Sequence, residues 1–145
     1  MKTFSKIGSG ARRSFQVSFG LRAGYGADAK EFTLEQAKAA LHGWMHARAA
    51  AGQPFLTGQL MAGQVVYAWP DGPGKAGTGD EPGAMFVGEV SVLYDAAATD
   101  DEVVARLDEL AAHLGNALEQ TRVYAAYGDK TWVMEVEKGE TPTGK

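Results

Sequence analysis

The same helix-start signal occurs twice in this chain, as Thr33-Leu-Glu-Gln36 and as Thr99-Asp-Asp-Glu102. In each, a threonine at the cap position is followed three residues later by Gln or Glu, which can bond back to the cap. Apolar residues recur at helical spacing behind both signals, so we predict amphipathic helices over residues 34–51 and 100–119. Any fold for this chain must therefore provide a surface for two apolar helix faces.

The segments around these helices are typical of strands. Phe15, Val17, Phe19 and Leu21 alternate with polar or small residues, which indicates a strand with one buried face. Further strands are predicted over residues 55–69, 85–94, 122–127 and 131–137, the last two joined as a hairpin. This order predicts an α+β, ferredoxin-like two-layer sandwich: a βαββαβ unit plus an extra C-terminal hairpin strand. Its antiparallel sheet would carry both helices on one face.

A chain of 145 residues has the length of one domain. We predict a single domain over residues 13–137, with a flexible N-terminal arm over 1–12 and a flexible tail over 138–145. Residues 70–83 hold three of the chain's five prolines and five of its 19 glycines, with few side chains able to pack. They are predicted to form a long, mobile loop.

Composition excludes several classes of function. With 14 Lys and Arg against 18 Asp and Glu, the net charge is −4, which argues against a nucleic-acid partner bound through a broad basic surface. The absence of cysteine excludes disulfides and thiolate chemistry. No stretch is apolar enough for a membrane span or a signal peptide, so a cytoplasmic protein is expected. No metal site, cofactor or catalytic residue is predicted.

The order of elements, with a flexible tract between the middle strands, resembles that of the PII signalling proteins and the CutA proteins, which are trimers of ferredoxin-like units. Dimeric α/β-barrel proteins share the same order. No sequence motif of these families is present, so no functional residue is carried over. The second face of the predicted sheet mixes polar and bulky residues, and we expect another copy of the chain to cover it, as a dimer or trimer.

Three features indicate where a ligand could bind. The loop that holds Arg22, Gly24 and Gly26 follows a strand and precedes a helix, and it can present backbone N–H groups and a guanidinium to an anion. Two aromatic residues lead into the 70–83 tract and could stack on a planar ligand. Lys75 lies in the middle of that tract and Glu89 interrupts an apolar strand. The candidate ligand-binding set is Arg22, Gly24, Gly26, Tyr67, Trp69, Lys75 and Glu89.

These features favour a non-enzymatic homo-oligomer that binds a small anionic or nucleotide-like ligand for regulation or sequestration, with the 70–83 tract closing over the site. One alternative is a cofactor-independent enzyme of the dimeric α/β-barrel type, with Glu89 or a histidine as base. Another is an acidic protein-binding or inhibitor module that uses the second helix, which carries most of the chain's clustered carboxylates.

Overall fold

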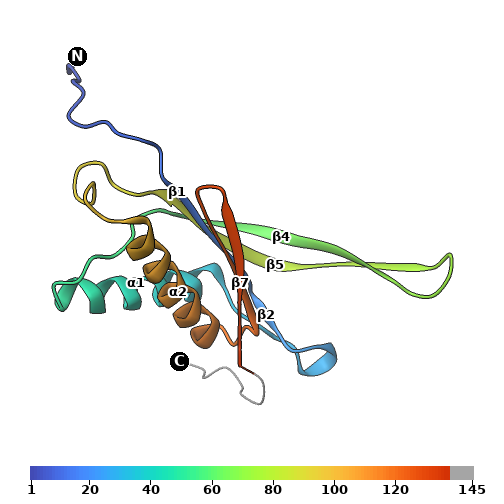
Figure 1. Ribbon diagram of the computed structural model, residues 1–145. Helices are drawn as coiled ribbons and strands as arrows, with labels where there is room; N and C mark the ends of the chain where they lie inside the picture. Colours follow the sequence, from blue (N-terminus) through green and yellow to red (C-terminus); the bar gives the residue numbers. More distant parts are fainter. Residues whose placement is uncertain (138–145) are drawn as a thin grey trace.

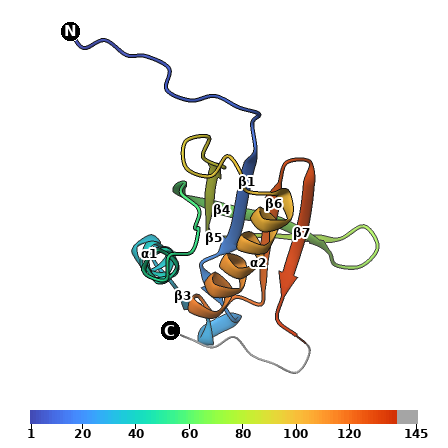
Figure 2. The same cartoon turned by 60° about the vertical axis from the view of Figure 1, so that its left-hand side comes forward.

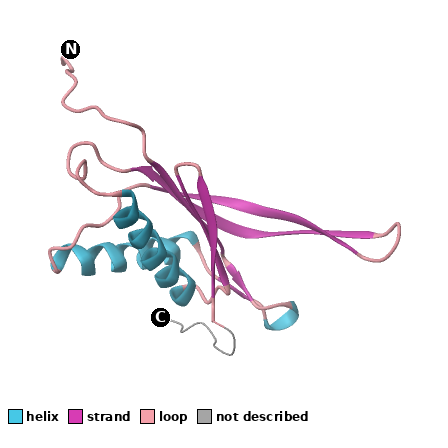
Figure 3. Ribbon diagram, viewed as in Figure 1, coloured by secondary structure: helices cyan, strands magenta, loops and turns pink. Residues whose placement is uncertain are grey.

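The computed structural model describes residues 1–137 and has five long strands and two α-helices (Figure 1). The strands form one antiparallel sheet in the order β4-β5-β1-β6-β7. Both helices lie on the same side of this sheet, so its other face is left open (Figure 3). The prediction of an α+β fold, with an antiparallel sheet and two helices, is confirmed.

The two helices begin where the sequence predicts. Helix α1 spans Leu34–Ala50 and helix α2 spans Asp100–Ala117, each with a complete capping box. The Gln36 and Glu102 backbone N–H groups each donate to a threonine Oγ1 at 3.1 Å, and both side chains bond back to the cap. These contacts satisfy backbone donors that would otherwise lack a partner in the first turn.

The long strands are β1 (Ser14–Gly20), β4 (Gln59–Pro70), β5 (Ala76–Glu89), β6 (Arg122–Tyr127) and β7 (Lys130–Glu135). A separate small ribbon pairs β2 (Arg22–Ala23) with β3 (Lys30–Glu31) around a 3₁₀ turn at Gly26–Asp28. This ribbon, which the sequence did not indicate, replaces the end of the first predicted strand and lies below the sheet in Figure 1.

The core lies between the helices and the inner face of the sheet. Phe15, Val17 and Phe19 of β1 are buried, as the alternation predicts, and Phe86 of β5 packs against Phe15 with ring centroids 5.6 Å apart. Helix α2 and its C-cap residue supply a continuous buried stripe that includes Val103, Leu107, Leu110, Leu114 and the C-cap Leu118. Burial of these side chains is the main stabilising contribution, because each fully buried one adds roughly 1.5–3 kcal/mol.

The predicted 70–83 loop is corrected by the structure. Residues 76–83 belong to β5 and pair with β4, so that only residues 71–75 form the turn of a long hairpin that extends beyond the sheet (Figure 1). The glycines of this tract face aromatic side chains: a Cβ on Gly77 would lie 2.3 Å from the Trp69 ring and one on Gly79 would lie 2.9 Å from the Tyr67 hydroxyl. Because glycine has no side chain, these residues leave room on β5 for the aromatic rings of the opposite strand, β4.

A buried ion pair fixes the connection between β5 and α2. Arg106 of α2 is 4% exposed, and its guanidinium bonds both carboxylate oxygens of Asp95. Bidentate pairing of this kind is what makes burial of an arginine tolerable.

Residues 1–13 have no regular secondary structure, and the N-terminal part of this segment projects from the domain (Figure 2). Its later part lies against the domain, where the Arg13 carbonyl oxygen accepts a hydrogen bond from the Val90 N–H. The predicted tail over residues 138–145 lies outside the described residues. Among the described helices, none is both long and apolar enough to cross a membrane.

Candidate functional site

Three glycines lie side by side on the open face of the sheet. The register pairs Gly63 of β4 with Gly83 of β5, and Gly83 with Gly20 of β1. We call these three residues the glycine row. The row adds no side chain to the open face, but its neighbours cover part of it: a Cβ on Gly83 would lie 2.8 Å from Val65, and one on Gly20 would meet Gln120 and Glu81. Bare backbone is therefore left at Gly63, where nothing lies within 4 Å of such a Cβ.

A cavity of about 700 Å³ lies over the glycine row. On one side it is bounded by the neighbouring row of the sheet, where Met61, Met85, Ser18 and Tyr124 lie next to one another in register. The Met61, Met85 and Tyr124 side chains are between 37% and 47% exposed, so they offer an apolar wall to a ligand. A volume of this size is typical of small-molecule sites.

The other side of the cavity is polar and is built around Gln120, which follows α2. Glu119 has a φ of 53°, a left-handed conformation usually taken by glycine, and this ends the helix and turns the chain toward the cavity. Gln120 is 8% exposed; its Nε2 donates to the carbonyl oxygens of Arg22 at 3.1 Å and Leu118 at 3.0 Å. With the amide nitrogen fixed in this way, Oε1 is held toward Gly20.

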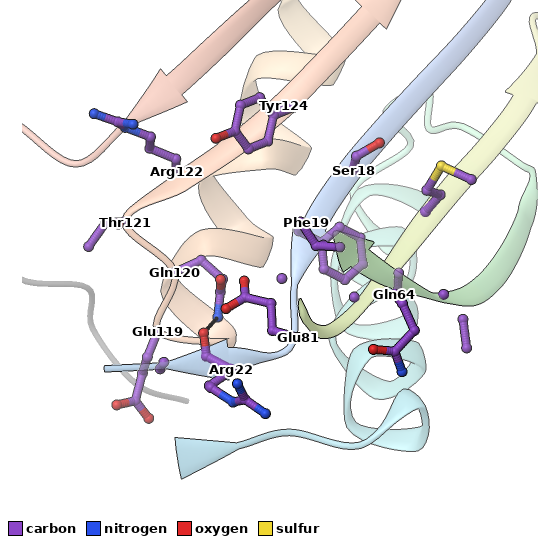
Figure 4. A pocket seen from close by; sticks show the side chains of 18 of the residues that line it. Ser18, Phe19, Arg22, Gln64, Glu81, Glu119, Gln120, Thr121, Arg122 and Tyr124 are labelled. Atoms are coloured by element: carbon purple, nitrogen blue, oxygen red, sulfur yellow. Dashed lines mark hydrogen bonds between the residues drawn. The ribbon is translucent and has the colours of Figure 1, made fainter. Parts of the chain in front are cut away.

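Glu81 of β5 meets Gln120 above Gly20 (Figure 4). A Cβ on residue 20 would lie 2.8 Å from Gln120 Oε1 and 2.9 Å from Glu81 Oε1. Two oxygen acceptors thus converge on one point. Glu81 is half-buried and forms no hydrogen bond and no ion pair with any residue of the described chain, 1–137.

The other charged side chains that line the cavity are in ion pairs. Arg22 contacts Glu31 of the β2–β3 ribbon at 2.7 Å, and Arg122 contacts Glu135 of β7 at 2.8 Å. The bond to its carboxylate partner raises the pKa of each arginine. Glu119 contacts Lys30 at 2.6 Å. These pairs leave the Glu81 carboxylate without an ion-pair partner of its own among the described residues, although its charge also acts on the nearby Arg22.

Two of the candidate ligand-binding residues line this cavity. Arg22 and Gly24 both contribute to it, as does Tyr25 between Gly24 and Gly26. Gly24 and Gly26 have φ values of 81° and 67°, so the backbone freedom inferred for this loop is used in the turn of the β2–β3 ribbon. Gly26 does not line the cavity.

The structure separates the other candidates from this group. Tyr67 and Trp69 lie on the hairpin with ring centroids 5.9 Å apart and do not line the cavity, although Tyr67 is close enough to Arg22 to interact with it electrostatically. Lys75 closes the turn of that hairpin through a backbone bond to Gly72. Residues 70–83 therefore do not form a loop that folds over the Arg22 region, because most of them are paired in a strand.

Glu89 lies at the opposite end of β5 from the cavity's polar corner. Its carboxylate accepts hydrogen bonds from the Ser14 hydroxyl and from Arg12 Nε, the latter at 3.2 Å. These bonds, the one from Ser14 above all, lower the pKa of Glu89. A general base needs a pKa near the working pH, and these bonds move the pKa of Glu89 the other way.

Sequence reasoning missed Glu81, Gln120 and the glycine row. Gly83 and Glu81 fall within the tract that was interpreted as a loop, so their place on a sheet face was hidden. Glycines at positions 77 and 79, which lie opposite Trp69 and Tyr67, are the signal that could have indicated a strand.

Comparison with known proteins gives a likeness of fold. No protein-family model matches the chain, and no curated protein matches its sequence. Among solved structures, a phage SAM lyase in complex with S-methyl-5'-thioadenosine is similar, with a TM-score of 0.66 and 15% sequence identity. The match covers 95% of this chain and 100% of the lyase. The apo state of a phage SAM lyase has a TM-score of 0.63 at 15% identity and covers 96% and 100%.

This comparison corrects the hypothesis of a non-enzymatic regulatory or sequestering protein. The solved structures that share the fold are those of an enzyme, and one of them holds a nucleoside thioether. The part of the hypothesis that concerns a small nucleotide-like ligand agrees with that bound molecule.

Proposed function

We propose that this chain is an enzyme that binds S-adenosylmethionine (SAM) in the cavity over the glycine row and cleaves it to S-methyl-5'-thioadenosine. The observation that carries the proposal is this cavity, which has bare backbone at Gly63 and the Glu81 carboxylate, without an ion-pair partner, at its polar corner, in a fold like that of a SAM lyase. At 15% sequence identity the likeness to the lyase supports a shared fold. The support for SAM as the substrate comes from the residues that line the cavity.

The cavity suits an adenine nucleoside. A purine ring is flat, and the backbone at Gly63 offers it a surface without side chains, since nothing lies within 4 Å of a Cβ placed there. The Met61 and Met85 thioethers at the edge of this surface make favourable contacts with aromatic rings. The Tyr124 ring adds a further apolar group on the same side.

The reaction breaks the bond between the sulfonium sulfur and the four-carbon amino acid chain. The electron pair of this bond passes to sulfur, which becomes the neutral thioether of methylthioadenosine. The substrate's own carboxylate oxygen attacks the carbon that sulfur leaves, and the fragment departs as a lactone. No water and no proton acceptor are consumed, so the protein contributes by holding the carboxylate in line with the C–S bond.

We propose further that the domain has the ferredoxin-like topology and works as a homo-oligomer. The strand order β4-β5-β1-β6, with a helix after β1 and another after β5, supports the topology. The exposed Met61, Tyr124 and Val133 side chains on the open face support contact with a second copy. Sedimentation at micromolar concentration is expected to give a mass of two or three times 15.4 kDa, and a mass of 15.4 kDa would contradict the oligomer.

Chromatography of SAM incubated with the purified chain tests the proposed activity. Methylthioadenosine is expected to accumulate in proportion to protein concentration and faster than in buffer, where SAM decays spontaneously. Decay at the rate seen in buffer would contradict the proposal.

A further inference from the structure

Glu81 and Gln120 present two acceptor oxygens to one point of the cavity, and no described residue donates a hydrogen bond to either oxygen. Both oxygens lie within 2.9 Å of the position that a Cβ on Gly20 would take. Neither oxygen is fully buried, so both are open to the cavity, and two converging acceptors suit a ligand that brings N–H groups and positive charge. We infer that this pair binds the α-ammonium group of the substrate.

The charges around the pair favour a cation at this point. Arg22 is close enough to Glu81 for the two charges to interact, but its guanidinium is held at Glu31, with Nη1 directed to the Asp80 carbonyl oxygen at 3.4 Å. Arg22 therefore does not form an ion pair with Glu81. An ammonium group has three donors, which matches a carboxylate and an amide oxygen that converge from two sides.

The inference rests on the proposed function and adds a specificity to it. SAM carries an ammonium and a sulfonium, whereas methylthioadenosine carries neither. If Glu81 and Gln120 hold the ammonium, they bind substrate and contribute nothing to binding of the nucleoside product. The same pair then directs the amino acid half of the substrate to the polar corner and leaves the purine over Gly63.

The Glu81→Gln variant tests this role with three ligands. S-adenosylhomocysteine has the ammonium without the sulfonium, so it separates the two positive groups. We expect the KM for SAM and the Kd for S-adenosylhomocysteine to rise together by about tenfold to a hundredfold, as for a lost charge-assisted hydrogen bond. The Kd for methylthioadenosine is expected to stay within about twofold, which also shows that the variant is folded.

Glu89→Gln is the matched control, because Glu89 lies on the same strand and the same face but outside the cavity. This control is expected to change none of the three values. Loss of SAM binding alone would assign Glu81 to the sulfonium and overturn the inference, as would equal losses for all three ligands. If the unmodified chain binds none of the ligands and releases no methylthioadenosine, the proposed function itself fails.

Discussion

Replacing Gly63 with valine is expected to stabilise the fold while closing the site. The backbone at Gly63 is not left-handed, and nothing lies within 4 Å of a Cβ placed there, so valine fits without strain. Within a strand, valine is more favourable than glycine by about 1 kcal/mol. For a chain of this length, that corresponds to a rise in Tm of roughly 3 °C.

The three side-chain carbon atoms of this valine would project from the floor of the cavity, where we expect the purine to lie. Isothermal titration with methylthioadenosine is therefore expected to show at least a tenfold weaker Kd. Gly43→Ala is the matched control: Gly43 lies in α1 with nothing within 4 Å of its Cβ, and the change adds up to about 1 kcal/mol of helix stability. This control should raise the Tm and leave the Kd unchanged. A Gly63→Val protein that binds like the unmodified chain would refute this assignment of the ligand position.

Two further expectations concern stability. Asp95→Ala leaves Arg106 buried without its partner and should cost about 3–5 kcal/mol in urea unfolding, most of which a second change, Arg106→Met, should restore. The Tyr127 hydroxyl, above all, lowers the pKa of Asp100, so this carboxylate stabilises the fold above its unfolded pKa, near 3.8. That contribution is lost as the pH falls further, and Asp100→Asn should flatten the decline of Tm in acid.

Local patterns were sufficient to predict the helices and most strands. The capping boxes at Thr33 and Thr99 involve residues three apart, so the sequence shows them directly. The alternation around Val17 likewise reports which face of β1 is buried. Both patterns depend on residues that are close in the sequence, and for that reason the structure agrees with what they predict.

The hairpin and the polar corner depend on pairing across the chain. Gly77 forms part of a strand because Trp69, eight residues earlier, covers it. Gln120 faces the cavity because Glu119 adopts a left-handed conformation, a departure that propensity alone does not predict. Glu81 meets Gln120 only once β5 pairs with β1, so no local pattern joins these two residues.

Methyl NMR of methionine-labelled protein tests most directly whether the cavity over the glycine row binds a nucleoside. The chain has five methionines, of which Met61 and Met85 line the cavity, whereas Met1, Met45 and Met134 do not. Addition of methylthioadenosine should shift the Met61 and Met85 methyl resonances in a saturable manner and leave the other three in place. Saturable binding that leaves the Met61 and Met85 resonances unmoved, or no binding at all, would contradict the proposed site.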